Sequence, residues 1–522
     1  MIQLNESGLS KRSSWEMAGY SFPAFDRKKV IKNTAERPLW VHFGAGNIFR
    51  AFQANVVQKL LNNGIMDIGL VVAEGYDYEI IEKVNIPHDN YSILVTLKSD
   101  GSMEKTVVGS IVKSLTLDSE NKADFSNLKE IFRKDSLQIA SFTITEKGYR
   151  LNNGPKRQES YIGKVVSLLY ERYLAGGKPI AMVSMDNCSH NGSRLSEAVS
   201  AYSEEWAALG YVQKGFVDYV SNPKKVSFPW SMIDKITPRP DSAVENILKK
   251  DGVQGMEPVV TQKNTYIAPF VNAEESEYLI IEDAFPNGRP PLEEGGIVFT
   301  SRQTVEQVER MKVCTCLNPL HTALAIFGCL LGYDLISEEM KDETLHKLVE
   351  GIGYNEGLPA VTDPGILAPK EFLDTVLNTR LPNPFMPDTP WRIATDTSQK
   401  LAVRFGETIK AYIASPDLDV SDLKLIPLVF AGWLRYLMAV DDDGRDFELS
   451  PDPLLPEISS CVSTIRLGAE VDPGKLFMPI LKNEQIFGIN LCEAGMADIV
   501  CSYFSQMITG PGAVKSTLHK YV

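Results

Sequence analysis

The chain has 522 residues, 44% of them apolar and 23% charged, and its 53 Lys and Arg against 67 Asp and Glu give a formal net charge of −14. At roughly 100–200 residues per domain, this length predicts two or more domains and excludes a small disulfide-stapled scaffold. The acidic balance argues against a general affinity for nucleic acid or anionic membranes, because such surfaces repel a negative protein at long range. Local basic pockets for small anions remain compatible with it.

Cysteine usage and the lack of long apolar runs predict a cytoplasmic protein. The seven cysteines are odd in number and thinly spread, which suits a reducing compartment. Cys314 and Cys316 are close together, but no second Cys or His pair stands at zinc-site spacing, so we expect packing residues and no metal. The N-terminus lacks the apolar core of a signal peptide, and no stretch approaches about 18 uninterrupted apolar residues.

The first regular pattern in the chain is strand, glycine turn, helix, strand. Residues 1–36 are polar and irregular, so we expect a surface extension there. An apolar run at 39–43 then leads through Gly44-Ala45-Gly46 into apolar residues at helical spacing, and a second apolar run follows at 68–73. Two parallel strands joined in this way need a right-handed crossover.

Two further buried strands are predicted at 137–145 and 180–185, and a helical pattern at 165–174 precedes the second. Strands that alternate with helices predict an α/β fold, a Rossmann-like doubly wound parallel sheet over residues 37–290. Ligands of such sheets bind at the carboxyl ends of the strands, where this chain carries glycine, acidic and amide residues.

The composition changes at residues 286–296, a Pro- and Gly-rich stretch that we expect to be a linker. Beyond it, long apolar segments at 321–336, 398–413 and 422–440 show helical patterns without strand alternation. We therefore predict a second, mainly α-helical domain over residues 291–522.

The glycine turn is an incomplete dinucleotide-binding fingerprint, because Phe49 stands at the third glycine position. Its context favours a nucleotide site over an ordinary turn: the first glycine permits the tight turn, the second lets the backbone approach a pyrophosphate, and the following helix offers free N–H groups. The residues expected to contact the cofactor here are Gly44, Ala45, Gly46, Asn47, Ile48 and Phe49.

Acidic residues near the strand ends bear on the choice of cofactor. Glu74 ends the second strand, where a carboxylate would accept hydrogen bonds from ribose hydroxyls and repel a 2′-phosphate, so NAD is favoured over NADP. Asp77 is a second candidate, and an exposed loop acid is the alternative for both. Thr145 and Glu146, after the third strand, are also expected at the cofactor.

In the second half, Lys312, Asn318 and His321 stand in the apolar segment MKVCTCLNPLHTALAIFG. A lysine among apolar residues can accept a proton near neutral pH because burial disfavours its charged form, and an amide and an imidazole could hold an alcohol or carbonyl oxygen. The alternatives are structural: Asn318 followed by Pro319 is a good helix start, His321 suits a core, and Lys312 suits a solvated helix end.

These residues resemble the polyol-specific long-chain dehydrogenases, which comprise mannitol dehydrogenases and the fructuronate and tagaturonate reductases. The resemblance implies an N-terminal dinucleotide domain, a helical C-terminal domain with the substrate between them, and no required metal. It spans most of the chain, through the segments VHFGAGNIFRAFQA, SFTITEKGY, MVSMDNCSHNG, FPWSMIDKITP, YLIIEDAFPNGRPPLEEGGIVF, the Lys-Asn-His segment, and WLRYL followed by DDDG.

The resemblance implies that Lys312 is the general acid/base, with Asn187 and Asn318 beside the reacting oxygen. Two neutral amide donors suit an alkoxide-like transition state, because they stabilise negative charge without competing for the proton. His321 would position the substrate, and Asp234 would lie near the site.

One spacing departs from the family pattern. Relatives place the lysine five residues before the asparagine, whereas Lys312 precedes Asn318 by six. On an ideal helix, at ~100° per residue, Lys312 would point about 120° away from Asn318 and roughly opposite His321. Either a separate segment ending before Pro319 or a helical bulge would bring them back to one side.

The substrate is expected to be a sugar acid or a polyol. A sugar acid needs a cation for its carboxylate, and the segment after residue 382 supplies Arg392, Lys400 and Arg404; the resemblance implies that Arg392 contacts substrate. We favour NAD(H)-dependent interconversion of a keto sugar acid and its hydroxy acid, such as fructuronate and mannonate. The alternatives are a mannitol-type polyol 2-dehydrogenase and a catalytically silent nucleotide-binding protein. We expect a monomer or homodimer without nucleic-acid or membrane partners.

Overall fold

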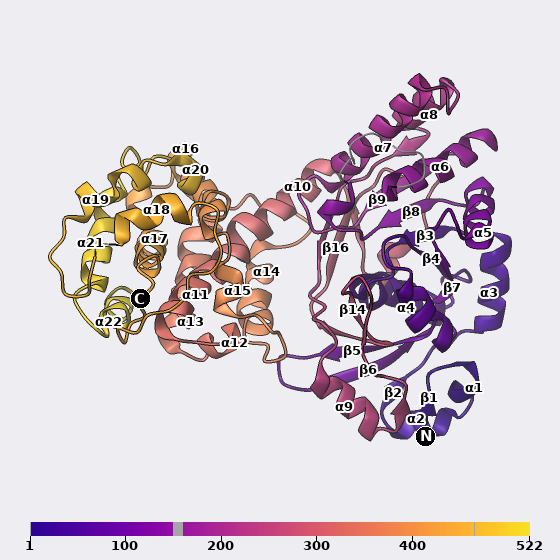
Figure 1. The fold of residues 1–522 in the computed structure, drawn as a ribbon, viewed down its shortest axis with the longest axis horizontal. Coiled ribbons are helices and arrows are strands. Elements are labelled where there is room, and N and C mark those ends of the chain that lie inside the picture. Colours follow the sequence, from indigo (N-terminus) through magenta and orange to yellow (C-terminus); the bar gives the residue numbers. More distant parts are fainter. Residues whose placement is uncertain (1, 150–159, 464) are drawn as a thin grey trace. The chain divides into compact units, whose positions relative to one another are not determined.

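The computed structural model describes residues 2–149, 160–463 and 465–522, and it divides into two compact units (Figure 1). One comprises Met1–Lys98 and Ser102–Glu306, and the other comprises Gln307–Val522 together with Ser99–Gly101. This division falls within helix α10 (Arg302–Met311), later in the chain than the boundary expected after residue 290.

A six-stranded sheet forms the centre of the N-terminal unit, and all of its neighbouring strands run parallel. This confirms the doubly wound sheet. The strand order is β10-β9-β8-β3-β4-β7, with bounds β3 (Trp40–Phe43), β4 (Leu70–Glu74), β7 (Ile111–Thr116), β8 (Ile139–Phe142), β9 (Ile180–Ser184) and β10 (Val226–Ser227).

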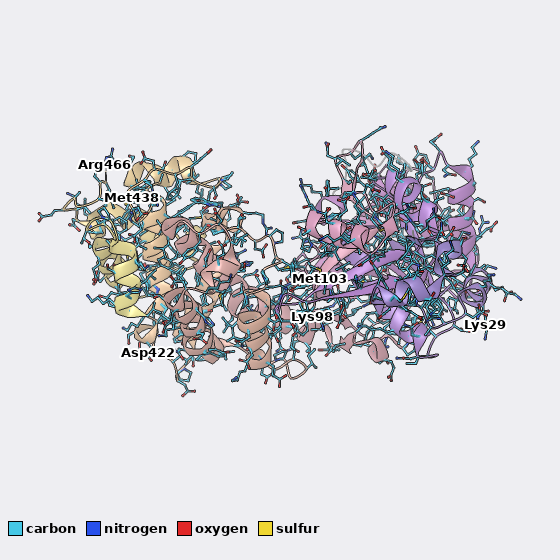
Figure 2. All side chains as sticks on the ribbon, turned by 90° about the horizontal axis from the view of Figure 1, so that it is seen from below. Lys29, Lys98, Met103, Asp422, Met438 and Arg466 are labelled. Atoms are coloured by element: carbon cyan, nitrogen blue, oxygen red, sulfur yellow. The ribbon has the colours of Figure 1, made fainter. Side chains whose placement is uncertain are left out.

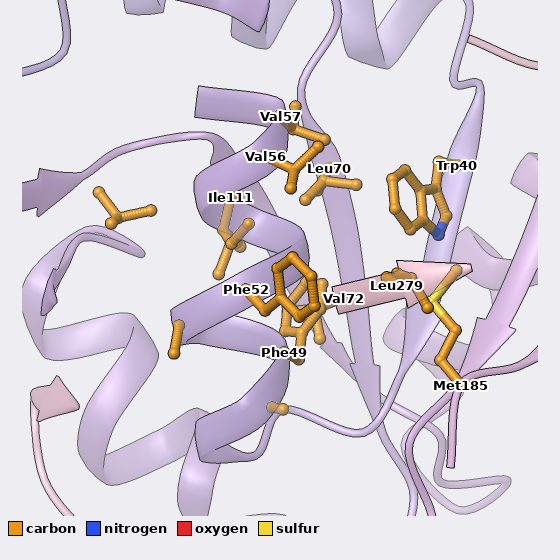
Figure 3. Packing of buried hydrophobic residues seen from close by; sticks show 14 of the residues in the cluster. Trp40, Phe49, Phe52, Val56, Val57, Leu70, Val72, Ile111, Met185 and Leu279 are labelled. Carbon is orange, nitrogen blue, oxygen red and sulfur yellow. The ribbon is translucent and has the colours of Figure 1, made fainter. Parts of the chain in front are cut away.

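Each face of this sheet packs against its own helices, because side chains alternate along a strand. Trp40 and Val72 face one core, where the π-helical turn η1 (Phe49–Gln53) and α4 (Ala54–Asn62) cover them (Figure 3). Val41 and Phe43 face the other core, covered by α5 (Lys122–Arg133), α6 (Tyr161–Leu174), α7 (Asn191–Ala208) and α8 (Gly215–Ser221).

Residues 2–36 are part of this unit, so the expected irregular extension is wrong. Strand β1 (Ile2–Gln3) pairs with β12 (Val253–Gln254), and β2 (Tyr20–Ser21) pairs with β6 (Met103–Val108). Trp15 is fully buried, its ring edge-on to Tyr20 at 5.0 Å. A few large apolar residues anchor a polar segment. Its helices are α1 (Glu6–Leu9), α2 (Arg12–Met17) and α3 (Arg27–Glu36).

The Pro- and Gly-rich stretch at 286–296 is not a linker. It contains the 3-10 turn η5 (Leu292–Gly295), in which Leu292 is fully buried, and a Cβ on Gly295 would lie 2.6 Å from Val56. The turn residues here let the chain pack closely against α4, and they do not form a flexible joint.

The smaller sheets complete the N-terminal unit. Their bounds are β5 (Ser92–Leu97), β11 (Ser231–Asp234), β13 (Val259–Val260), β14 (Tyr266–Ile267), β15 (Phe270–Glu274), β16 (Tyr278–Glu282) and β17 (Val298–Thr300). The remaining helical segments are η2 (Ile81–Asn85), η3 (Ile86–His88), η4 (Glu146–Tyr149) and α9 (Ser242–Lys250).

The described residues of the C-terminal unit form helices and connecting loops, as expected, with side chains filling the space between them (Figure 2). Among described segments, one helix, Arg302–Leu331, is long and apolar enough to cross a membrane, but 83% of its apolar window is buried in protein. That long helix comprises α10, η6 (Lys312–Cys316) and α11 (Asn318–Leu331).

The remaining described helices of the C-terminal unit are α12 (Ile336–Glu339), α13 (Glu343–Glu350), η7 (Gly351–Gly357), η8 (Leu358–Ala360), α14 (Pro369–Thr375), η9 (Val376–Arg380), α15 (Pro390–Ala394), η10 (Thr397–Gln399), η11 (Ala402–Gly406), α16 (Glu407–Ala414), η12 (Val420–Asp422), α17 (Leu425–Tyr436), α18 (Leu455–Val462), α19 (Pro473–Leu481), α20 (Glu484–Phe487), α21 (Ala497–Met507) and α22 (Ala513–Tyr521).

Candidate functional site

The glycine turn has the geometry that a dinucleotide needs. Gly44 has φ +113°, and a Cβ there would lie 2.5 Å from the Thr143 carbonyl oxygen, so only glycine fits. A Cβ on Gly46 would meet no heavy atom within 4 Å, which leaves its backbone open to a pyrophosphate. The turn follows β3 beside β8, where the strand order switches direction, and such switch points are where ligands bind.

Not every predicted residue of this turn faces outward. Phe49 is fully buried, stacked on His42 with ring centroids 4.0 Å apart, so its side chain belongs to the core and a contact of its backbone N–H with the cofactor stays a prediction. Ala45 is also buried. Asn47 accepts a hydrogen bond from Arg50 Nη2 at 2.8 Å, and Ile48 is half-buried.

Glu74 ends β4 as predicted, and its carboxylate is bonded to the chain's own backbone. It accepts hydrogen bonds from the N–H groups of Ala45 (2.8 Å), Tyr76 (2.8 Å) and Asp77 (3.1 Å). Burial raises the pKa of Glu74 although these bonds oppose the rise. The carboxylate thus holds the glycine turn against β4, and its contact with a ribose stays a prediction. Asp77 is also buried and accepts a hydrogen bond from Thr261.

The segment after β8 is fastened to the end of β9 by Asp186. Its carboxylate accepts from the backbone N–H groups of Ile144 (3.0 Å) and Thr145 (2.8 Å), and burial raises its pKa. Thr145 has a left-handed backbone, φ +64°. Glu146 is exposed and pairs with Arg194 at 2.6 Å.

The two predicted substrate-side residues of this unit differ in exposure. Asn187 follows Asp186 directly and is exposed, whereas Asp234 is buried at the end of β11. Both positions stay predictions for the site.

In the C-terminal unit, a π-helical turn separates Lys312 from Asn318. The Leu317 N–H bonds to the Lys312 carbonyl at 3.1 Å, an i to i+5 bond whose turn holds one residue more than an α-helical turn. The bulge, one of the two expected arrangements, is confirmed, and it absorbs the extra residue before α11 begins at Asn318. Lys312 is buried, and Cys314 and Cys316 are buried packing residues as expected.

His321, one turn into α11, is a neutral imidazole. Burial lowers its pKa to about 3, and the charges of four cations, Arg404, Arg380, Arg392 and Lys400, act in the same direction. Its Nε2 lies 3.5 Å from Asp388 Oδ2 but, among the described residues, has no hydrogen-bond partner although it is buried. A hydrogen bond between that nitrogen and a substrate hydroxyl stays a prediction.

The four side chains around His321, here called the cationic cluster, come from separate elements: Arg380 from η9, Arg392 from α15, Lys400 after η10, and Arg404 from η11. Arg392 pairs with Asp388, and Lys400 donates to the Ile393 carbonyl at 3.2 Å. Arg404 donates to Thr322 Oγ1, and burial lowers the pKa of Arg404 to about 10.

The sequence pointed to Arg392 and Lys400 as substrate-binding residues and offered Arg404 only as a nearby cation. Arg380 was not predicted. Arg380 ends η9. No local pattern marks it, because its electrostatic effect on His321 depends on the tertiary structure.

Comparison with known proteins shows to which family the chain belongs. Residues 39–294 match the model of the mannitol dehydrogenase Rossmann domain, and residues 304–504 match that of the mannitol dehydrogenase C-terminal domain. The chain belongs to the mannitol dehydrogenase family. This confirms the family resemblance and makes the chain a dehydrogenase acting on a CH–OH group.

Relatives span the chain fully. A D-mannonate oxidoreductase of Thermotoga maritima is 53% identical over 100% of this chain and 99% of its own length. The Pseudomonas fluorescens mannitol 2-dehydrogenase, solved as a ternary complex with NAD and D-mannitol, has TM-score 0.68 and 25% identity over 99% of both chains. A substrate-free D-sorbitol dehydrogenase structure has TM-score 0.74 and 23% identity, covering 96% of this chain and 100% of its own, and shows the fold.

Proposed function

We propose that this protein interconverts D-fructuronate and D-mannonate, a keto sugar acid and its hydroxy acid, with NAD(H). The observation that carries the proposal is the cationic cluster: four cations lie near one neutral histidine, and Asp388 pairs with Arg392. A carboxylate needs such cations, because burying an anion without a partner is costly, whereas a neutral polyol needs only hydrogen bonds. The 53% identical D-mannonate oxidoreductase supports the same substrate.

The cofactor is NAD, and when bound it would supply hydride transfer to and from the substrate carbon. Gly44, Gly46 and the first N–H groups of the following helix would hold its pyrophosphate. Glu74 keeps that turn in place through the Ala45 N–H, and its negative charge disfavours a 2′-phosphate.

Lys312 would be the residue that transfers the proton. Its Nζ would take the hydroxyl proton in oxidation and return it to the carbonyl oxygen in reduction. The amides of Asn187 and Asn318 would donate to that oxygen as negative charge develops. His321, through its unpartnered Nε2, would bond a substrate hydroxyl.

The carboxylate of the sugar acid would bind to the guanidinium groups of the cationic cluster. Arg404 is the strongest candidate, since the described contacts join it only to a neutral partner, Thr322 Oγ1. Arg392 and Lys400 would add charge, and Asp234 would lie near the site. Thr145 and Glu146 would lie at the cofactor.

We further propose a cytoplasmic monomer or homodimer that acts on small molecules, requires no metal, and binds neither nucleic acid nor membrane. All seven cysteines are free thiols, which suits a reducing compartment. The net charge of −14 disfavours polyanion partners.

The test is to follow NADH absorbance with fructuronate, tagaturonate and fructose, and NAD reduction with their reduced partners. Turnover on fructuronate and mannonate is expected. Turnover on fructose and mannitol alone would establish the polyol dehydrogenase instead, and NADH binding without turnover on any of them would establish a silent nucleotide-binding protein. Lys312→Ala serves as the inactive control.

A further inference from the structure

A hydrogen-bonded network lies in the sheet directly beneath the glycine turn. Strands β3 and β8 pair in register, with His42 opposite Ser141. Trp40 Nε1 donates to Ser141 Oγ at 2.6 Å, His42 Nδ1 lies 2.6 Å from the same oxygen, and His42 Nε2 lies 2.8 Å from Thr143 Oγ1. Trp40, His42 and Ser141 are all fully buried.

The neutral ring of His42 and the Trp40 donor fix the direction of each hydrogen bond in this network. Burial lowers the pKa of His42 to about 3, so the ring is neutral and carries one N–H. The Ser141 oxygen already accepts from Trp40, and the acceptor that its own hydrogen can reach is His42 Nδ1. The ring proton is therefore on Nε2, which donates to Thr143 Oγ1.

Thr143 Oγ1 accepts in this arrangement, so its own hydrogen must point elsewhere. Its described contacts give this hydroxyl no partner other than His42. Thr143 is half-buried and follows β8 at its carboxyl end, at the point where the strand order switches. A Cβ on Gly44 would lie 3.0 Å from Thr143 Oγ1, so the hydroxyl stands beside the first glycine of the turn.

We propose that Thr143 binds the dinucleotide, its hydroxyl donating a hydrogen bond to an oxygen of the pyrophosphate or the adjoining ribose. His42 and Ser141 are positioning residues, because the N–H of His42 occupies one lone pair of Thr143 Oγ1 and leaves the hydroxyl hydrogen free to donate. Phosphate and ribose oxygens are acceptors, so the network prepares the turn for this cofactor before it binds. The proposal rests on the cofactor of the proposed function and concerns residues to which no role has so far been given.

The experiment measures NADH binding by fluorescence titration in wild type, Thr143→Val and Thr143→Ser. Thr143→Val keeps the shape and removes the hydroxyl, so we expect the Kd to rise about tenfold, the effect of a hydrogen bond to a charged group. Thr143→Ser retains the donor and should bind within about twofold of wild type. Thermal unfolding midpoints check that both variants fold.

Titrations with ADP and ADP-ribose locate the acceptor. A loss with all three ligands assigns it to the ADP part, either the pyrophosphate or the adenosine ribose, and a loss with NADH and ADP-ribose alone assigns it to the ribose on the nicotinamide side. Equal NADH affinity for wild type and Thr143→Val, or equal loss in Thr143→Ser and Thr143→Val, would overturn the proposal. Wild type that fails to bind NADH would overturn the cofactor itself.

His42→Gln tests the positioning role. Made alone, His42→Gln should weaken NADH binding. Made together with Thr143→Val, it should weaken binding little beyond the effect of Thr143→Val alone, because both changes disable the same donor. Additive losses in the double variant would mean that His42 acts independently of Thr143. If His42→Gln fails to fold, the Val and Ser variants decide the proposal.

Discussion

The cationic cluster sets the charge around His321. Its four side chains differ in exposure, from the buried Arg380 to Arg392, whose side chain is 63% exposed and pairs with Asp388. Their field together with burial keeps the His321 imidazole neutral. Like charges grouped in this way repel one another, so we propose that the substrate carboxylate joins them and offsets that repulsion.

Replacing Arg404 tests this reasoning. Arg404→Gln removes one cation and should raise the KM for D-mannonate about tenfold or more, since hydrogen bonds to charged groups contribute about 1.5–3 kcal/mol. The kcat/KM for D-mannitol should change less than about twofold. Lys410→Gln removes the same charge from an exposed ion pair with Glu407 and serves as the control. Equal losses with acid and polyol would contradict a carboxylate role.

Glu339 is a buried carboxyl group outside the cationic cluster. Its carboxylate is fully buried, neither oxygen has a hydrogen-bond partner among the described residues, and burial raises its pKa well above 4.5. A raised pKa means that its contribution to stability is present below about pH 4.5 and is lost as the pH rises through the folded-state value.

Glu339→Gln should therefore flatten the dependence of stability on pH. The variant's thermal midpoint relative to wild type should rise between pH 5 and pH 9, since glutamine stays neutral throughout. Calorimetry at several pH values measures this difference. A difference that stays constant with pH would show that Glu339 does not titrate in this range.

Residue type and position in a strand–turn–helix pattern predicted the glycine turn at Gly44 and Gly46 and the place of Glu74 at the end of β4. The roles of the Lys-Asn-His segment came from the family resemblance and stay predictions. The Thr143 hydroxyl could not be found in this way, because its role depends on the register of β3 against β8. That the Phe49 side chain enters the core could not be predicted either, because the rotation of the helix decides which side chains are buried.

At the scale of elements, the π-helical turn η6 decides whether the lysine can act with α11. The extra residue between Lys312 and Asn318 enters a turn closed by an i to i+5 bond, so the helix continues without the rotation that an insertion would otherwise cause. The sequence indicated that some break was needed there but could not choose between a bulge and a separate segment.

Exchanging two neighbouring residues tests the bulge. The double variant Lys312→Val, Val313→Lys keeps the composition and gives the five-residue spacing of relatives, but it moves the lysine to another side of the turn. We expect kcat to fall at least about 100-fold, as in Lys312→Ala, because general acid/base catalysis contributes about 10²–10⁴-fold. Activity near wild type in the double variant would mean that η6 does not orient the lysine.

At the scale of the whole molecule, the residues proposed for cofactor binding and those proposed for proton transfer and carboxylate binding belong to different units. The N-terminal unit carries the glycine turn and the C-terminal unit carries Lys312 and the cationic cluster. Strand and helix patterns predicted both fold types, but the structure divides later in the chain than the expected boundary, because η5 packs on α4 instead of joining domains.

The N-terminal segment is a structural part of its unit, and Trp15 is the residue that tests this. Trp15→Ala should lower the free energy of unfolding of that unit by about 3–5 kcal/mol, the usual cost of emptying a buried aromatic site. Met17→Ala, two residues away and exposed, should change it by less than about 0.5 kcal/mol. Urea denaturation measures both, and equal stability of the two variants would restore the view of a loose extension.

The substrate preference of the wild-type enzyme tests the central claim most directly. The measurement is the ratio of kcat/KM for D-fructuronate to that for D-fructose with NADH, at one pH and salt concentration. Because each hydrogen bond from the cationic cluster to a carboxylate contributes about 1.5–3 kcal/mol, the account predicts a ratio of about 100 or more. A ratio near one, or a preference for fructose, would contradict it.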